Sequence, residues 1–314
     1  MPLSALLRHG LPLLLLLTFS AGVVRANEPA VLVVSSERSP AYLEAAEAVT
    51  NELGRLTTET RRQVLQFTVA DLPAYRGAAP RLYIALGAEA CGLLGRTPAP
   101  APVLCALLPR ASFERVLRET GRRAGASLSA LYLNQSLGRQ LDLMRMALPQ
   151  ARRVGVLWGA DSQASETMLE SAAQARGLKV VGVPVKLDEP VFNGLKKILD
   201  ESDLLLALAD PQIYNGSSIQ NILLASFRAQ VPMLAFSPAY VRAGALMAVY
   251  STPAQIGQQA GLIARGVLQG QPLGVPQYPL QFEVSVNEHV ARSLGLKLDA
   301  GNLAERLRRQ ERGS

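Results

Sequence analysis

The chain has 314 residues, of which 49% are hydrophobic and 18% are charged, and its formal net charge is +7. This apolar content excludes an intrinsically disordered protein, and the length exceeds what one hydrophobic core usually holds. The positive charge is spread along the chain without aromatic residues between the cations, so no nucleic-acid partner is expected. Composition therefore favours two packed lobes.

The first 26 residues have the features of a secretory signal peptide. Arg8 precedes the apolar run LPLLLLLTFSAGVV, which is short for a membrane-spanning helix. The tripeptide VRA before Asn27 has small residues at both cleavage positions, so we expect cleavage after Ala26. The first cysteine, Cys91, lies far from this point, which argues against a lipoprotein. We predict a soluble periplasmic protein, with an uncleaved anchor as the alternative.

From Ala30 onward, short β-rich runs alternate with helical segments. The runs AVLVVSS, QVLQFTVA, RLYIALG and PVLCALL predict the strands of one open parallel sheet. Ser39 and Pro40 are typical of a helix start. Further helices are predicted after Gly87 and after Ala111.

A second series of elements begins at Ser136, which we expect to cap a helix. The runs RVGVLW, LKVVGVPV, DLLLALA and VPMLAFS are uniformly apolar, as strands are when helices cover both faces of a parallel sheet. The chain continues through GALMAVYS, a long helix from Pro253 to about Gln269, the strand PLQFEVSVN and a short helix near Asn287. These trailing segments fit two lobes that exchange segments across a hinge.

The pattern predicts an α/β protein of two Rossmann-like lobes, whose mostly parallel sheets are joined by a hinge. We expect lobe 1 to comprise residues 27–128 and about 243–272, and lobe 2 to comprise 129–242 and about 273–298. Residues 299–314 are expected to form a C-terminal helical tail. Glutamates interrupt its basic cluster, as in a solvated helix. The basic residues are Arg306, Arg308, Arg309 and Arg312, and the acidic ones are Glu305 and Glu311.

Motifs of enzyme active sites are absent from the sequence. After removal of the signal, His289 is the one remaining histidine, so a histidine-based metal site or a Ser-His-Asp triad lacks support. The motifs G-x-S-x-G, G-x-G-x-x-G, G-x-x-x-x-G-K and C-x-x-C do not occur. We therefore predict a protein without catalysis, cofactor or metal. The enzyme alternative is a carboxylate-based hydrolase that uses Glu89 with Asp161 or Asp210.

Polar and aromatic residues gather where the predicted strands end. In α/β proteins, ligands bind beyond the carboxyl ends of parallel strands. If two sheets face each other across a hinge, these ends form one cleft, in which helix N-termini receive an anion and aromatic faces receive an apolar group. The expected ligand-binding residues are Ser35, Ser36, Glu37, Gly87, Glu89, Trp158, Asp161, Ser162, Asp210, Tyr214, Ser237 and Tyr250.

Some of these residues also have structural explanations. Asp161 and Ser162 are ordinary helix-capping residues. Trp158, the only tryptophan, fits the core of a lobe as well as it fits a cleft. The spacing of Cys91 and Cys105 suits neighbouring βα units, and an oxidising compartment permits a disulfide between them, with two buried thiols as the alternative.

Three segments of the second half follow one another in a recognisable order. They are QLDLMRMALPQARRVGVLWGADSQASETMLESAAQARGLKVVGVPV, VPMLAFSPAYVRAGALMAVYSTPAQIGQQAGLIARGVLQG and FEVSVNEHVARSLGLKL, within about Ser136 to Leu298. Together they resemble one family of ABC-transporter solute-binding proteins with the periplasmic-binding-protein type I fold. Members of that family with assigned ligands include binders of aromatic amino acids.

The resemblance implies a monomer that closes on a small solute, amino acid-like or another small organic molecule, and delivers it to an ABC permease and its ATPase. The first half departs from the family pattern: Leu108-Pro109 and GASLSALYLNQS stand where the family usually has Asp-Pro and an Asn-Val-Thr-Gly turn. The family's ligand is therefore not transferred to this chain. A periplasmic sensor or envelope accessory protein without transport is the alternative.

Overall fold

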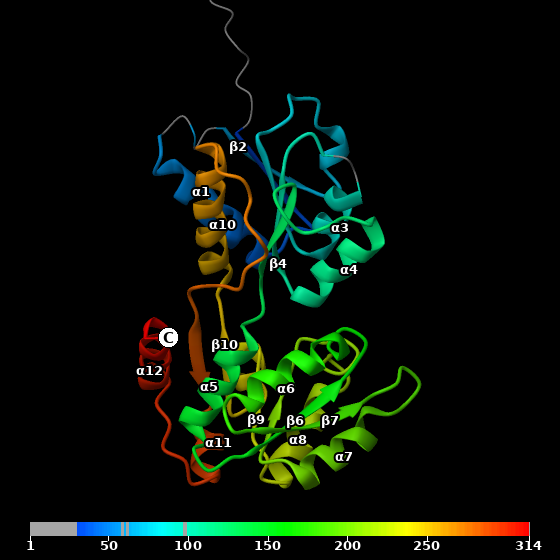
Figure 1. Ribbon diagram of the computed structural model, residues 1–314, viewed down its shortest axis with the longest axis vertical. Helices are drawn as coiled ribbons and strands as arrows, with labels where there is room; N and C mark the ends of the chain where they lie inside the picture. The colour runs from blue at the N-terminus through cyan, green and yellow to red at the C-terminus, as the bar shows by residue number, and fades with distance from the viewer. Residues whose placement is uncertain (1–29, 58–59, 61–62, 97–98, 314) are drawn as a thin grey trace, which may run out of the picture.

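The computed structural model describes residues 30–57, 60, 63–96 and 99–313. It consists of two lobes joined by three crossing segments (Figure 1). The expected signal peptide, residues 1–26, lies outside the described residues. Among the helices that are described, none has the length and apolar character needed to cross a membrane.

The first lobe is built on a five-stranded sheet of order β2-β1-β3-β4-β5, in which every pairing is parallel. Its strands are β1 (Val31–Ser35), β2 (Val64–Thr68), β3 (Leu82–Leu86), β4 (Val103–Leu108) and β5 (Leu128–Tyr132). Helices cover both faces, and each face has its own hydrophobic cluster. One face carries α1 (Pro40–Gly54) and α10 (Pro253–Leu268), and the other carries α3 (Ala88–Arg96) and α4 (Arg110–Thr120). A short 3-10 turn, η1 (Leu72–Ala74), follows β2.

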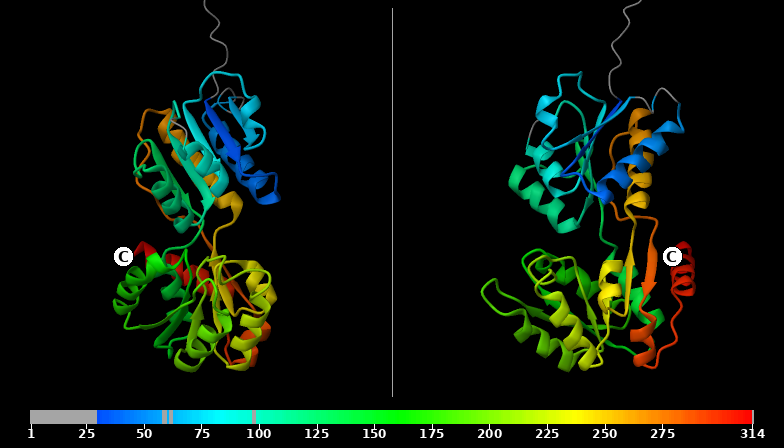
Figure 2. Two further views of the ribbon diagram at one scale, coloured as in Figure 1. Left: turned by 90° about the vertical axis from the view of Figure 1, so that its right-hand side faces the viewer. Right: turned by 180° about the vertical axis from the view of Figure 1, so that it is seen from behind.

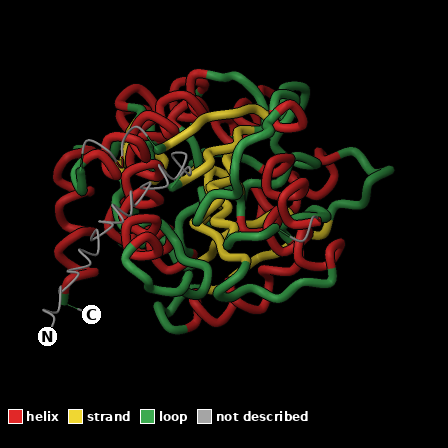
Figure 3. Tube along the Cα trace, turned by 90° about the horizontal axis from the view of Figure 1, so that it is seen from above, coloured by secondary structure: helices red, strands yellow, loops and turns green. Residues whose placement is uncertain are grey.

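The second lobe is built on a six-stranded sheet of order β11-β10-β9-β8-β6-β7, which is parallel except where β11 pairs with β10. Its strands are β6 (Arg153–Trp158), β7 (Lys179–Pro184), β8 (Leu204–Leu206), β9 (Met233–Ala235), β10 (Met247–Tyr250) and β11 (Glu283–Val286). Its helical segments are α5 (Leu137–Ala147), η2 (Gln163–Ser165), α6 (Glu166–Gln174), α7 (Val191–Glu201), α8 (Ile219–Arg228), α9 (Pro238–Ala243), α11 (Glu288–Ser293) and α12 (Ala300–Arg312). Seen from above, the strands lie among surrounding helices (Figure 3). The predicted fold class is confirmed: this is an α/β protein of two lobes with mostly parallel sheets.

Helix α10 packs against α1 in the first lobe, although the strands on either side of it, β10 and β11, belong to the second (Figure 1). The two helices approach closely at Gly257, where a Cβ atom would lie 2.2 Å from the carbonyl oxygen of Ala45. A capping box formed by Thr252 and Gln255 fixes the start of α10. The lobes therefore exchange segments, as the order of the sequence patterns predicts.

The divisions between the lobes differ from the expected ones. Strand β5 pairs with β4 in the first sheet, whereas the sequence places residue 129 at the start of lobe 2. Strand β10 pairs with β9 in the second sheet, whereas residues 243–272 are expected in lobe 1. The apolar run of β5 is short and includes Ser129, so its pairing rather than its pattern determines where it lies.

The C-terminal helix α12 is a helix as predicted, but one of its faces is buried. Leu303 and Leu307 belong to the core of the second lobe, and Glu311 pairs with Arg139 of α5. The expectation of a solvated helix therefore holds only for its outer face, because the apolar residues recur at helical spacing and pack inward.

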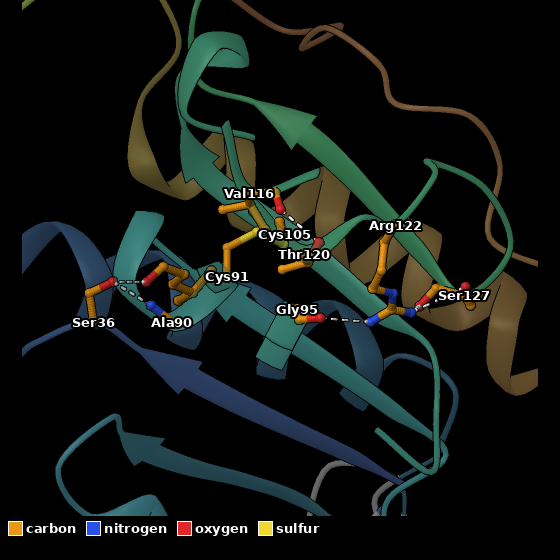
Figure 4. Close-up of a disulfide and its surroundings, with 10 residues drawn as sticks. Ser36, Ala90, Cys91, Gly95, Cys105, Val116, Thr120, Arg122 and Ser127 are labelled. Atoms are coloured by element: carbon orange, nitrogen blue, oxygen red, sulfur yellow. Dashed lines mark hydrogen bonds between the residues drawn. A yellow bond between two sulfur atoms is a disulfide. The ribbon is translucent and has the colours of Figure 1, made fainter. Parts of the chain in front are cut away.

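Cys91 of α3 and Cys105 of β4 form a disulfide, with Cα atoms 5.4 Å apart (Figure 4). Both cysteines are buried. Of the two sequence alternatives, the structure shows the bridge. It joins the helix after β3 to the strand that leads into α4, and α4 begins at the edge of the interlobe cleft.

Candidate ligand-binding cleft

A cavity of about 440 Å³ lies between the lobes. It adjoins a narrower space of about 50 Å³ that shares part of its lining. The first lobe contributes the start of α4 and the first crossing segment, and the second lobe contributes the ends of β6, β8, β9 and β10. Six of the predicted site residues line these two spaces: Asp161, Ser162, Asp210, Tyr214, Ser237 and Tyr250.

The second-lobe wall of the cleft is rich in aromatic side chains. The ring of Phe236 lies edge-on to Tyr240, with centroids 4.9 Å apart, and 6.1 Å from Tyr214. Burial raises the pKa of Tyr214, and the nearby Asp210 raises it further, so this phenol stays neutral. An aromatic wall of this kind suits an apolar, planar part of a ligand.

Phe236 and Tyr240 are site residues that the sequence analysis missed. They flank Ser237-Pro238, where β9 ends and α9 begins, and the Ser237 side chain caps that helix. The sequence signal was the run AFSPAY, because a Phe that stands between the end of a strand and a Ser-Pro helix start lies at the cleft edge.

Asp210 positions the loop after β6. Its Oδ2 atom accepts hydrogen bonds from the backbone N–H of Asp161 (3.1 Å), the backbone N–H of Ser162 (2.9 Å) and the Ser162 hydroxyl (2.8 Å). Its Oδ1 atom accepts from the backbone N–H of Gln212 at 3.0 Å. The carboxylate is buried and a Cβ on Gly159 would lie 2.5 Å from it. Asp210 therefore both lines the cleft and holds the loop after β6 in place.

Asp161 points across the cleft to the first lobe. Both of its carboxylate oxygens lie 2.5 Å from Nη2 of Arg115, on α4. A second contact between the lobes runs from Nη1 of Arg110 to the sulfur of Met168 on α6, at 3.1 Å. In this arrangement of the lobes, the carboxylate of Asp161 is already neutralised by a cation of the protein.

The start of α4 forms the first-lobe wall. Its N-cap, Pro109, makes no side-chain capping bond, and the backbone N–H of Arg110 is bound by Oδ1 of Asn134 at 2.9 Å. Ala111 and Ser112, in the first helical turn, also line the cleft. The free N–H groups of a helix start attract anions and carbonyl oxygens, so this wall offers a polar end opposite the aromatic one.

The Arg110 side chain is held beside this wall. Burial acts to lower the pKa of Arg110, but hydrogen bonds with Tyr278 and Glu114 outweigh it and raise the pKa. Its Nε lies 2.6 Å from Glu114, and its Nη1 lies 3.3 Å from the Tyr278 hydroxyl. Its charge is thereby balanced within the first lobe.

Trp158 lies in the core of the second lobe. Its side chain is 1% exposed, it packs with Val156 beneath α5 and α6, and it lines neither part of the cleft. Its Nε1 has no hydrogen-bond partner among the described residues, and a Cβ on Gly182 would lie 2.3 Å from it. Because alternate strand residues face opposite sides, Trp158 follows Val154 and Val156 onto the face covered by α5 and α6. The structure thus agrees with the core alternative.

The remaining predicted residues lie at the ends of β1 and β3, and they do not line the two cleft spaces. Ser36 donates to the carbonyl of Leu86 at 3.1 Å and accepts from the backbone N–H of Ala90 at 3.1 Å, as Figure 4 shows in part. Its hydroxyl therefore fastens the start of α3. The full group is Ser35, Ser36, Glu37, Gly87 and Glu89.

Tyr42, which the sequence analysis did not select, lies in the middle of this group. A Cβ on Gly87 would lie 2.4 Å from the hydroxyl of Tyr42, and Gly87 has a φ of 93°. Both the close contact and the positive φ therefore exclude a side chain at Gly87. Burial raises the pKa of Tyr42, a hydrogen bond with Ser36 opposes this, and the carboxylates of Glu37 and Glu89 raise it further. This corner of lobe 1 is outside the cavity in the present arrangement.

Metal binding finds no support in the part of the chain that the structure describes, where no three His, Cys, Asp or Glu residues are grouped to hold an ion.

Comparison with known proteins identifies the family. The sequence profile described as ABC transporter substrate binding protein matches residues 121–305, more than half of the chain. The chain belongs to this family. The resemblance predicted from the sequence is confirmed, and the proteins of this family and its structural neighbours bind substrates rather than transform them.

A curated relative is a tyrosine-binding protein of Clostridioides difficile (strain R20291), 24% identical over 187 residues. The match covers 58% of this chain and 54% of the relative, so it spans about half of that protein's length.

Solved structures share the fold. An ABC domain in complex with L-Trp from Streptococcus pneumonia has a TM-score of 0.61 at 15% identity, covering 87% of this chain and 97% of that one. A ligand-free, open substrate-binding protein with adhesive properties from Clostridium difficile has a TM-score of 0.65 at 16% identity, covering 86% and 96%. At such low identity these likenesses establish the two-lobed architecture and not the ligand.

Proposed function

We propose that this protein captures a small molecule with a planar apolar part and a carboxylate, and delivers it to an ABC permease driven by an ATPase. The observation that carries the proposal is the cavity of about 440 Å³ between an aromatic wall on lobe 2 and a helix start on lobe 1. The tyrosine bound by the curated relative and the L-Trp in the solved complex have both of these parts.

Binding works by closure of the two lobes. The planar part of the ligand packs on Phe236 and Tyr240. Its carboxylate accepts hydrogen bonds from the backbone N–H groups of Ala111 and Ser112. A ligand that contacts both walls favours the closed arrangement, because only there does it make all of its contacts. The permease then distinguishes closed from open protein.

The proposal includes the location of the protein. Substrate-binding proteins of this family are periplasmic, and we propose export through the signal peptide with cleavage after Ala26. The mature protein then works as a monomer. A sensor role without transport remains the competing proposal, and it predicts binding without uptake.

Calorimetric titration of the mature protein with L-tyrosine and L-tryptophan tests the ligand class, with L-alanine and D-ribose as controls. We expect heat from the two aromatic amino acids alone. Phe236→Ala should weaken this binding at least tenfold, since the ring forms the wall. The matched control is Phe227→Ala, which removes an exposed ring on α8 outside the cleft. Failure of all planar carboxylates to bind would overturn the ligand class.

Delivery is tested separately. Uptake of the radiolabelled amino acid should fall in cells that lack the gene and should return with the wild type but not with Phe236→Ala. Full binding with unchanged uptake would support the sensor role instead.

A further inference from the structure

Arg139 of α5 is a buried charge at the hinge, with a side chain that is 8% exposed. Its Nη1 donates to Oε1 of Gln135 (2.5 Å), in the first crossing segment, and to the carbonyl of Pro279 (2.8 Å), in the third. Its Nε and Nη2 make a bidentate pair with Glu311 of α12, at 2.5 and 2.9 Å. The guanidinium also lies over the ring of Phe282, 4.3 Å from its centroid.

The second crossing segment joins the same network. The side-chain N–H of Gln135 donates to the hydroxyl of Ser251 at 2.9 Å, and that hydroxyl donates to the carbonyl of Gln281 at 2.5 Å. Gln135 and Ser251 are both buried. All three segments that connect the lobes, visible side by side in both views of Figure 2, are thus linked through one set of hydrogen bonds.

Attachments to the first lobe begin immediately beyond this network. Thr252, the residue after Ser251, starts the capping box of α10. Oε1 of Gln259, on α10, accepts from the backbone N–H of Leu280 at 2.8 Å, next to the Pro279 carbonyl that Arg139 holds. Only short stretches of main chain separate this network from the attachments to the first lobe. The φ and ψ changes that accompany rotation of the lobes must therefore occur in these stretches.

A buried guanidinium keeps its partners, because leaving it unpaired in the protein interior is unfavourable. We propose that Arg139, held by Glu311 of the C-terminal helix, is a positioning residue that fastens the three crossing segments to lobe 2 and sets the resting angle between the lobes. Through that angle α12 adjusts ligand affinity without touching the ligand, since apparent affinity follows the populated fraction of the binding-competent arrangement. The effect on affinity rests on the proposed closure, whereas the resting angle does not.

The test measures the distance between the lobes in the ligand-free mature protein by double electron–electron resonance. Spin labels are attached at Arg118→Cys on α4 and Glu170→Cys on α6, both exposed and on opposite lobes. The native cysteines are bridged and buried and do not react. In the labelled background, Glu311→Gln should replace the narrow distance distribution with a broader, shifted one.

The matched control is Glu305→Gln, the same chemical change on the same helix, where the glutamate pairs with Arg309 in solvent. It should leave the distribution unchanged. Arg139→Gln should reproduce the broadening expected with Glu311→Gln. If the Arg139 variant does not fold, the distance distribution of Glu311→Gln alone tests the proposal.

Distributions of Glu311→Gln that superimpose on those of the parent, together with a lowered melting temperature, would show a merely structural pair and overturn the proposal. Because no ligand is added, this result is independent of whether L-tyrosine or any other amino acid binds. Titration of L-tyrosine into the same variants then measures the consequence for affinity.

Discussion

Nη2 of Arg115 lies 2.5 Å from both carboxylate oxygens of Asp161, so an ion pair joins the two lobes across the cleft. Arg115 belongs to α4 of the first lobe, and Asp161 to the loop after β6 of the second. Their side chains are 46% and 20% exposed, so solvent and salt weaken their attraction.

Arg115→Gln should open the ligand-free protein slightly, because it removes this contact between the lobes. The pair is worth about 0.2–1 kcal/mol, as exposed ion pairs usually are. The radius of gyration from small-angle scattering should rise at low salt, and the difference from the wild type should vanish at high salt. Arg118→Gln, an exposed change one turn further along α4, is the control. Identical radii at low salt would show that the pair does not hold the lobes.

Asp210→Asn should destabilise the second lobe by about 1–3 kcal/mol, because several buried donors lose their anionic acceptor. Binding should fall as well, since the loop carrying Asp161 loses its anchor. Urea unfolding and calorimetric titration with L-tyrosine measure the two effects. Asp188→Asn, at an exposed loop position, is the control. Lost binding with unchanged stability would instead indicate direct contact between Asp210 and the ligand.

Trp158→Ala should cost about 3–5 kcal/mol of unfolding free energy, as removal of a buried aromatic side chain does. Trp158→Phe should cost less and preserve binding. Urea unfolding of both variants, followed by titration of the folded Phe variant with L-tyrosine, checks this. A large loss of affinity with near-normal stability in the Phe variant would place the ring in the cleft and contradict the core position.

The disulfide should stabilise the protein by about 3 kcal/mol, given that the cysteines are 14 residues apart. The double variant Cys91→Ala/Cys105→Ala should unfold at correspondingly lower urea concentration. Mild reductant should leave the native wild type unaffected, because both sulfurs are buried. Two free thiols found by mass spectrometry of the protein purified without reductant would refute the bridge.

Asp203 should contribute to loss of stability in acid. Burial acts to raise the pKa of Asp203, but hydrogen bonds from the Arg153 side chain and from the backbone N–H groups of Arg152 and Arg153 lower it below its ordinary value. A lowered folded-state pKa means that the stabilisation is complete above the unfolded value of about 3.9 and disappears as pH falls through the folded value.

Asp203→Asn should therefore remove part of the pH dependence of the unfolding free energy below about pH 4, with little change of slope at neutral pH. Urea unfolding across the acid range measures it. Parallel curves for variant and wild type throughout that range would contradict the assignment.

Much of the fold follows from sequence periodicity, since uniformly apolar runs between amphipathic segments predict buried parallel strands. The helix caps at Ser39 and Ser136 were also predictable, because a capping side chain binds backbone groups only a few residues away. The lobe to which β5 belongs was not predictable, because its apolar run is short and its place in the first sheet follows from its pairing with β4.

The cleft was predictable only in outline. The positions of strand ends were enough to place Asp161 and Tyr214 near the cavity, but the direction of each side chain determines which of the other predicted residues line it. Trp158 packs beneath α5 and α6 because it has the same parity as Val156 on β6, and the partners of Asp210 lie 48 and 49 residues away in the chain. Contacts of such sequence separation leave no local pattern.

The exchange of α10 between the lobes also determines the order in which the protein can fold. The face of α1 that carries Ala45 and Val49 is covered by α10, which is made only after most of the second lobe. A chain that ends before Pro253 therefore leaves the first lobe with an exposed apolar face. The first lobe therefore depends on a segment made after most of the second lobe, and a truncated chain is expected to aggregate rather than accumulate as a half-protein.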